Sequence, residues 1–150
     1  MKGTVATKES TIKRDWYLID VNGLTLGRIS TEIAKLLMGK SKPYFVRNLD
    51  CGDYVVVVNA EKVKVSGNKE ENKLYYRHSM YPGGFKAESL KELRSRRPEE
   101  IVARAVKGML PQNRLRDKML GRLHVFKGET HSFADKLKKK DLPAGRQGEN

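Results

Sequence analysis

The sequence has little cysteine and no long apolar run. Cys51 is the single cysteine among 150 residues, so the chain cannot form an internal disulfide. No stretch approaches the roughly 18 consecutive apolar residues of a membrane-spanning helix, and the N-terminus lacks the apolar segment of a secretory signal peptide. The hydrophobic residues, 38% of the chain, still suffice for a modest core without a disulfide or a structural metal. We therefore expect a cytoplasmic protein with no membrane partner.

The residue patterns that mark enzymes and metal sites are missing as well. His78, His124 and His131 are scattered, and none has a histidine or cysteine partner at metal-ligand spacing. No G-x-S-x-G nucleophile motif occurs. Asp50 and Asp53 flank a glycine, a pattern that favours a turn over an acidic catalytic pair. We expect no catalytic residue, no metal, no cofactor and no small-molecule substrate.

Acidic side chains are scarce relative to basic ones. Lys and Arg total 31 and Asp and Glu total 18, which gives a net charge of +13. The excess is uneven: residues 1–60 hold nine basic and six acidic side chains, whereas residues 104–140 hold eleven and three. A surplus of this size attracts a polyanion through Coulomb forces and counterion release. We favour a nucleic-acid partner over the alternative of a surface that is merely well solvated.

Strand and helix patterns alternate along the chain. Residues 16–20 predict a strand, and residues 26–38 predict an amphipathic helix that Thr25 caps and Gly39 ends. Residues 54–58 include four consecutive valines, which indicates a strand buried on both faces of a parallel sheet. Further expected elements are a short strand at 63–65, helices beginning near Ser89, Pro98 and Asn113, and a last strand at 123–126. This order predicts an α/β layer fold with a mainly parallel sheet. We expect a flexible lead-in at 1–14, one α/β RNA-binding domain at 15–128, and a basic polar tail at 129–150.

Three segments carry residues suited to RNA. The first segment, Gly23 to Arg28, joins a predicted strand to a predicted helix. In one interpretation the N-terminus of the helix and Arg28 bind a phosphate. In the other, Gly23 makes a turn and Gly27 allows the helix to pack closely on the sheet. The spacing matches neither a dinucleotide fingerprint nor a P-loop, and this favours the packing interpretation. A nucleotide-dependent enzyme built on residues 16–38 remains the rival hypothesis.

The second segment is a glycine-rich loop at residues 77–86. We expect it to lack regular hydrogen-bonded structure and to be ordered by a partner. Tyr81 and Phe85 suit stacking on an unpaired base, and Arg77 and Lys86 suit phosphate. The alternative is that the aromatic side chains fold back and anchor the loop on the core.

The third segment runs from Val106 to Arg122. Gly108 lowers helix stability, so we expect a close packing contact there. After Pro111 the chain carries Arg114, Arg116, Lys118 and Arg122, for which we favour phosphate binding over plain solvation.

Taken together, these stretches resemble the bacterial form of the large-subunit ribosomal protein thirteen family. The resemblance covers roughly residues 12–128 and rests on motifs in family order: Leu26-Gly27-Arg28, Ser66-Gly67-Asn68-Lys69, Tyr75-Tyr76-Arg77-His78-Ser79, Pro82-Gly83-Gly84 and Val106 to Pro111. It implies a three-layer α/β/α fold around a four-stranded parallel sheet. It also implies a non-enzymatic protein that binds large-subunit ribosomal RNA early in assembly, beside other large-subunit proteins.

The chain departs from the family pattern at two motifs and in its tail, Lys136 to Asn150, which matches nothing in the family pattern. The family usually has glycine where Arg116 stands, and its C-terminal His-Pro-His segment reads His131-Ser132-Phe133 in this sequence.

We expect a set of exposed basic and aromatic side chains to contact RNA. The expected backbone contacts are Arg28, Lys40, Arg77, Lys86, Lys107, Arg114, Lys118 and Arg122, and the expected base or sugar contacts are His78 and Tyr81. The third functional hypothesis is a regulatory RNA-binding protein that acts outside the ribosome. Co-sedimentation with ribosomes would distinguish a ribosomal protein from it.

The charge excess predicts strongly salt-dependent binding to large-subunit ribosomal RNA. If the protein neutralises about six phosphates, its affinity falls roughly a thousandfold between about 50 and 200 mM salt. Filter binding or fluorescence anisotropy across a salt series measures this dependence. A flat response would contradict the charge-based interpretation.

Overall fold

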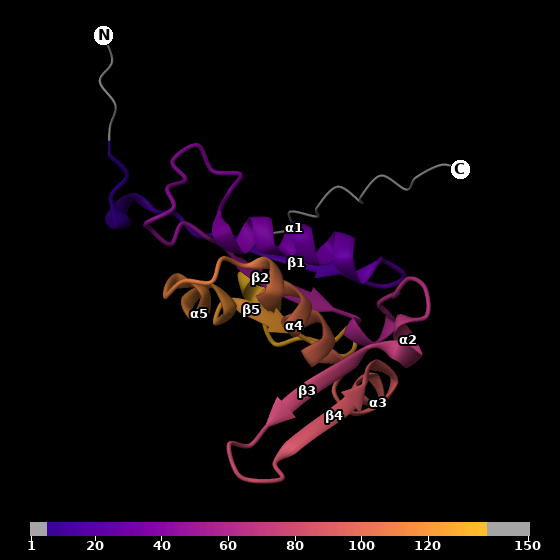
Figure 1. Ribbon diagram of the computed structural model, residues 1–150. Coiled ribbons are helices and arrows are strands. Elements are labelled where there is room, and N and C mark those ends of the chain that lie inside the picture. Colours follow the sequence, from indigo (N-terminus) through magenta and orange to yellow (C-terminus); the bar gives the residue numbers. More distant parts are fainter. Residues whose placement is uncertain (1–5, 138–150) are drawn as a thin grey trace.

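Within the described residues the main sheet has three parallel strands, and the buried valine strand lies in the centre. The computed structural model describes residues 6–137, so the ends of the expected lead-in and tail, 1–5 and 138–150, lie outside the described residues (Figure 1). The strands are β1 (Trp16–Asp20), β2 (Tyr54–Val58) and β5 (Leu123–Val125), in the order β1-β2-β5. All three strands were predicted from the sequence within one residue at each end.

The valines of β2 explain its central place. Val55, Val56 and Val57 are fully buried, as expected for a parallel strand with both neighbours paired and both faces covered. Successive side chains of a strand point to opposite faces. Val55 and Val57 therefore face one layer, while Val56 faces the other.

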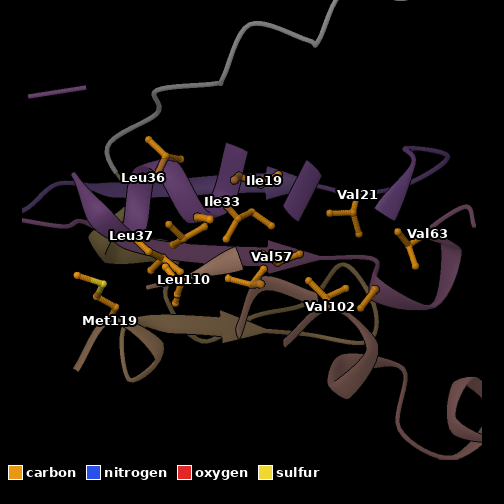
Figure 2. Close-up of a cluster of buried hydrophobic side chains, with 14 residues drawn as sticks. Ile19, Val21, Ile33, Leu36, Leu37, Val57, Val63, Val102, Leu110 and Met119 are labelled. Atoms are coloured by element: carbon orange, nitrogen blue, oxygen red, sulfur yellow. The ribbon is translucent and has the colours of Figure 1, made fainter. Parts of the chain in front are cut away.

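A single helical layer covers the first face. The core around Val57 draws on helices α1 (Leu26–Met38), α4 (Pro98–Met109) and α5 (Leu115–Leu120). Figure 2 shows this cluster, in which Val57 of β2 is joined by Ile33 and Leu37 of α1, Val102 of α4 and Met119 of α5. The amphipathic pattern predicted for residues 26–38 is confirmed in α1, whose Ile33, Leu36 and Leu37 are buried.

Aromatic rings, rather than a second helical layer, cover the opposite face. Trp16 stacks on Tyr54 with ring centroids 4.3 Å apart, and His124 stacks on Phe133 at 4.4 Å. Lys136, in the 3-10 helix Ala134–Lys136, lies over the Trp16 ring. The α/β class is confirmed, but in the described residues this face is closed by the segment after β5 and not by the third helical layer that was expected.

The expected fourth strand is reduced to a single bridge. Thr25 pairs with Lys64 in parallel, and the Lys64 N–H donates to the Leu24 carbonyl at 2.9 Å. Asn59 has a positive φ of 61° and opens a 3-10 helix, Ala60–Lys62, directly after β2. This turn diverts the chain, so only one residue comes into register beside the start of α1. Within residues 6–137 the parallel sheet has three strands, not four.

Two glycines let two backbone segments touch at the end of α1. Gly39 ends the helix with a φ of 74°, as predicted, and its N–H donates to the Leu36 carbonyl. A Cβ on Gly39 would overlap the Cys51 carbonyl, and one on Gly52 would overlap the Leu37 carbonyl. Glycine is therefore required at both positions. The predicted cap at the start of α1 is wrong, because the Thr25 side chain makes no capping hydrogen bond.

The segment that contains the glycine-rich loop is more regular than the sequence predicted. It comprises α2 (Lys69–Asn72) and an antiparallel hairpin of β3 (Leu74–His78) and β4 (Phe85–Ser89), which projects from the body in Figure 1. The expectation that residues 77–86 lack regular structure was wrong: Arg77 pairs with Lys86, and His78 with Phe85. Most residues of both strands are exposed, so no buried face marked them in the sequence.

Helix α3 (Leu90–Arg96) ties the hairpin to the domain. It begins at the predicted capping box, in which Ser89 and Glu92 exchange hydrogen bonds. The Arg94 guanidinium donates to the Glu61 and Val63 carbonyls and pairs with Glu70. The hairpin base is thus fixed, while its tip extends away.

Replacing Leu37 by alanine tests the core. Leu37 is fully buried beneath the sheet, and such a truncation costs about 2–5 kcal/mol through lost burial and the cavity left behind. Urea denaturation measures the loss. Leu24→Ala is the control, since Leu24 is 39% exposed and should change stability by at most about 0.5 kcal/mol. Equal losses would show that the assigned core is wrong.

Candidate nucleic-acid interface

Nine of the ten side chains predicted to contact RNA are exposed. They are distributed over α1, the turn after it, the hairpin, α4 and the segment around α5: Arg28, Lys40, Arg77, His78, Tyr81, Lys86, Lys107, Arg114 and Lys118. Their charged or aromatic groups are thus free to meet a partner. The structure does not gather them into one cleft, because they are spread over several separate elements.

Arg122 is the exception, and its predicted role as a phosphate contact is corrected. It is 7% exposed. Its guanidinium pairs with the Asp50 carboxylate and also donates to the Leu37 and Asp53 carbonyls. With its donors engaged inside the protein, Arg122 has a structural role.

A buried polar cluster surrounds Arg122. Arg14 also pairs with Asp50 and donates to the Gly52 carbonyl at 2.7 Å. The Lys42 ammonium pairs with the Asp53 carboxylate, whose side chain is 1% exposed. Sequence reasoning assigned Asp50 and Asp53 only to a turn. The two carboxylates in fact neutralise cations brought from distant segments.

The hairpin presents two chemically different faces. Arg77 and Lys86 lie opposite each other on one face, while Tyr76 and Phe85 stack on the other with centroids 5.5 Å apart. Tyr81 at the tip is 75% exposed. Its exposure contradicts the alternative that it anchors the loop.

Tyr75 is the aromatic residue that folds back. It packs against the second core cluster, formed by Leu90, Leu93 and Ile101. The Arg104 guanidinium lies 5.1 Å from its ring. Burial raises the pKa of the Tyr75 hydroxyl, and the positive charge of Arg104 partly opposes that shift. Within the same hairpin, Tyr75 therefore anchors the strand on the core, whereas Tyr81 is exposed.

Comparison with known proteins identifies the family. The family model described as "Ribosomal protein L13" matches residues 14–132. The chain belongs to this family. It is 55% identical over 128 residues to the large ribosomal subunit protein uL13 of Methylococcus capsulatus, covering 85% of this chain and 90% of that protein. It is 53% identical over 131 residues to the Dehalococcoides mccartyi protein of the same name, covering 87% and 92%.

Family membership confirms the resemblance inferred from the motifs. The L13 family is one of structural ribosomal proteins and not an enzyme family, which argues against the rival nucleotide-dependent enzyme. In the described part of the chain, no three His, Cys, Asp or Glu side chains come close enough to share a metal ion. None of the helices within residues 6–137 is long and apolar enough to cross a membrane.

Two glycines of the family motifs do not pack as predicted. A Cβ on Gly27 or Gly108 would meet no atom within 4 Å beyond its own helix backbone and chain neighbours, so neither glycine serves a close contact with another element. Gly23, in contrast, makes the expected turn with a φ of 71°. Gly27 and Gly67 border a hollow of about 700 Å³ beside the start of α1, which Lys69 and Lys73 also line. The backbone at these positions is open to an external partner.

Replacing Arg122 by glutamine tests its structural role. The change leaves Asp50, whose side chain is 10% exposed, without its main counter-ion, and removing one partner of a buried pair costs about 3–5 kcal/mol. Urea denaturation measures the stability. Arg114→Gln is the matched control, because Arg114 is exposed and its loss should cost under about 0.5 kcal/mol. Similar small losses in both variants would contradict the corrected role.

Proposed function

We propose that this protein is a structural component of the large ribosomal subunit that binds large-subunit ribosomal RNA and supports early subunit assembly in the cytoplasm. The match to the L13 family over residues 14–132 carries the proposal, since relatives about half identical are named as large ribosomal subunit proteins. Neighbouring ribosomal proteins are expected partners.

The charge distribution supports the RNA part of the proposal. Folding an RNA brings phosphates together against their mutual repulsion, and a basic protein offsets that repulsion. Within residues 6–137 the buried cations Arg122 and Lys42 are paired with Asp50 and Asp53, so the excess of basic side chains there lies mainly on the surface. The proposed phosphate contacts are Arg28, Lys40, Arg77, Lys86, Lys107, Arg114 and Lys118, and the proposed base or sugar contacts are His78 and Tyr81.

Ribosome association and assembly test the proposal directly. The protein should co-sediment with large subunits at a salt concentration that removes loosely bound proteins, and crosslinking should join it to large-subunit RNA. Depletion should cause precursors of the large subunit to accumulate. A protein that stays in the soluble fraction, with normal subunits in its absence, would instead act outside the ribosome.

The RNA contacts should be concentrated after residue 104. Arg114→Gln with Lys118→Gln should weaken RNA binding and lower the slope of log affinity against log salt by about 1 for each lost phosphate contact. Both residues are exposed, so the fold should remain intact. Lys8→Gln with Lys13→Gln is the matched control, because it removes the same charge from exposed positions near the N-terminus. An equal or larger loss in the control would refute this placement.

A further inference from the structure

We propose that the β3–β4 hairpin inserts between two RNA segments and contacts each with a different face. Unpaired bases of one segment stack on Tyr76 and Phe85, and phosphates of the other bind between Arg77 and Lys86. This inference rests on the proposed function and assigns separate RNA chemistry to each hairpin face.

The register of the hairpin separates the two kinds of side chain. The cross-strand pairs alternate: Arg77 with Lys86 on one face, then Tyr76 with Ala87 and His78 with Phe85 on the other. Paired residues of an antiparallel ladder share a face, and the next pair points the opposite way. One face therefore carries the basic pair and the other the aromatic rings. The side chains of these pairs are exposed on both faces, and the hairpin projects from the body (Figure 1).

The basic face is built to receive an anion. Like charges directly opposite each other destabilise a hairpin, yet Arg77 and Lys86 occupy such a pair. Within residues 6–137 neither forms an ion pair with an acidic side chain. Glu88, farther along this face, is already paired with Arg96 at 2.7 Å. A phosphate between Arg77 and Lys86 would relieve their repulsion.

The aromatic face is a preformed stacking platform. Tyr76 is 63% and Phe85 61% exposed, and their rings hold each other nearly parallel, with 25° between the planes. Aromatic rings fixed on a sheet surface bind unpaired RNA bases by stacking. Tyr81, in the turn between the two strands, is also exposed.

Charge decides between RNA and a protein as the occupant. A protein that covered the aromatic face would leave the Arg77–Lys86 pair on the opposite face unmatched. RNA supplies both bases and phosphates, and the net charge of +13 favours a polyanion.

Two double variants of the full chain separate the two faces. Tyr76→Leu with Phe85→Leu keeps the face apolar but removes its rings, so affinity for a large-subunit RNA transcript should fall about 5- to 150-fold with an unchanged salt slope. It should also abolish the quenching of 2-aminopurine in a short single-stranded oligoadenylate. Arg77→Gln with Lys86→Gln should lower the salt slope by about 1.4–1.8 and retain the quenching. Lys8→Gln with Lys13→Gln and Leu24→Ala serve as charge and apolar controls.

The outcomes distinguish the inference from the proposed function. If the unaltered protein fails to bind the transcript, the proposed function is wrong. If it binds but both hairpin variants bind equally well, the hairpin inference is wrong. If the leucine variant keeps its RNA affinity but loses a ribosomal protein on co-sedimentation, the aromatic face docks a protein, and the inference is again overturned. If the double leucine variant unfolds, Tyr76→Leu alone repeats the stacking test, since Tyr76 is 63% exposed, and it should weaken binding without changing the melting temperature.

Discussion

The complete burial of β2 is the constraint on which the rest of the structure depends. A strand of consecutive valines needs cover on both faces and a partner at both edges. The helices α1, α4 and α5 cover one face, and the rings of Trp16, Tyr54, His124 and Phe133 cover the other. Strands β1 and β5 occupy the edges. The rest of the domain surface can therefore carry charged side chains, and the hairpin lies outside the main sheet.

Local patterns predicted most of the fold, because helices and buried strands repeat with fixed periods. The capping box of α3 and the glycine at the end of α1 were visible in neighbouring residues alone. The number of strands could not be predicted from local patterns, because a single backbone turn at Asn59 decides whether residues 63–65 extend the sheet. The hairpin was missed because its strands are short and its middle is rich in glycine.

The candidate interface was predictable in composition but not residue by residue. Exposed cations such as Arg114 and Lys118 follow helical spacing, so their position outside the core could be expected. Arg122 belongs to the same basic run, yet its environment depends on Asp50, which is 72 residues away in the sequence. No local pattern reveals such a pair. The open backbone at Gly27 and Gly108 likewise depends on what the fold leaves vacant around them.

The backbone contacts of Gly39 with Cys51 and of Gly52 with Leu37 affect which insertions and deletions the chain tolerates. The residues between Gly39 and Gly52 form a loop whose two ends lie against each other, backbone to backbone, with no side chain between them. Its ends are fixed together, so its middle is a closed surface loop whose length is not set by the core. Insertions or deletions among exposed residues such as Arg47 and Asn48 should leave the sheet undisturbed. A single added methyl group at either glycine would instead force the two segments apart.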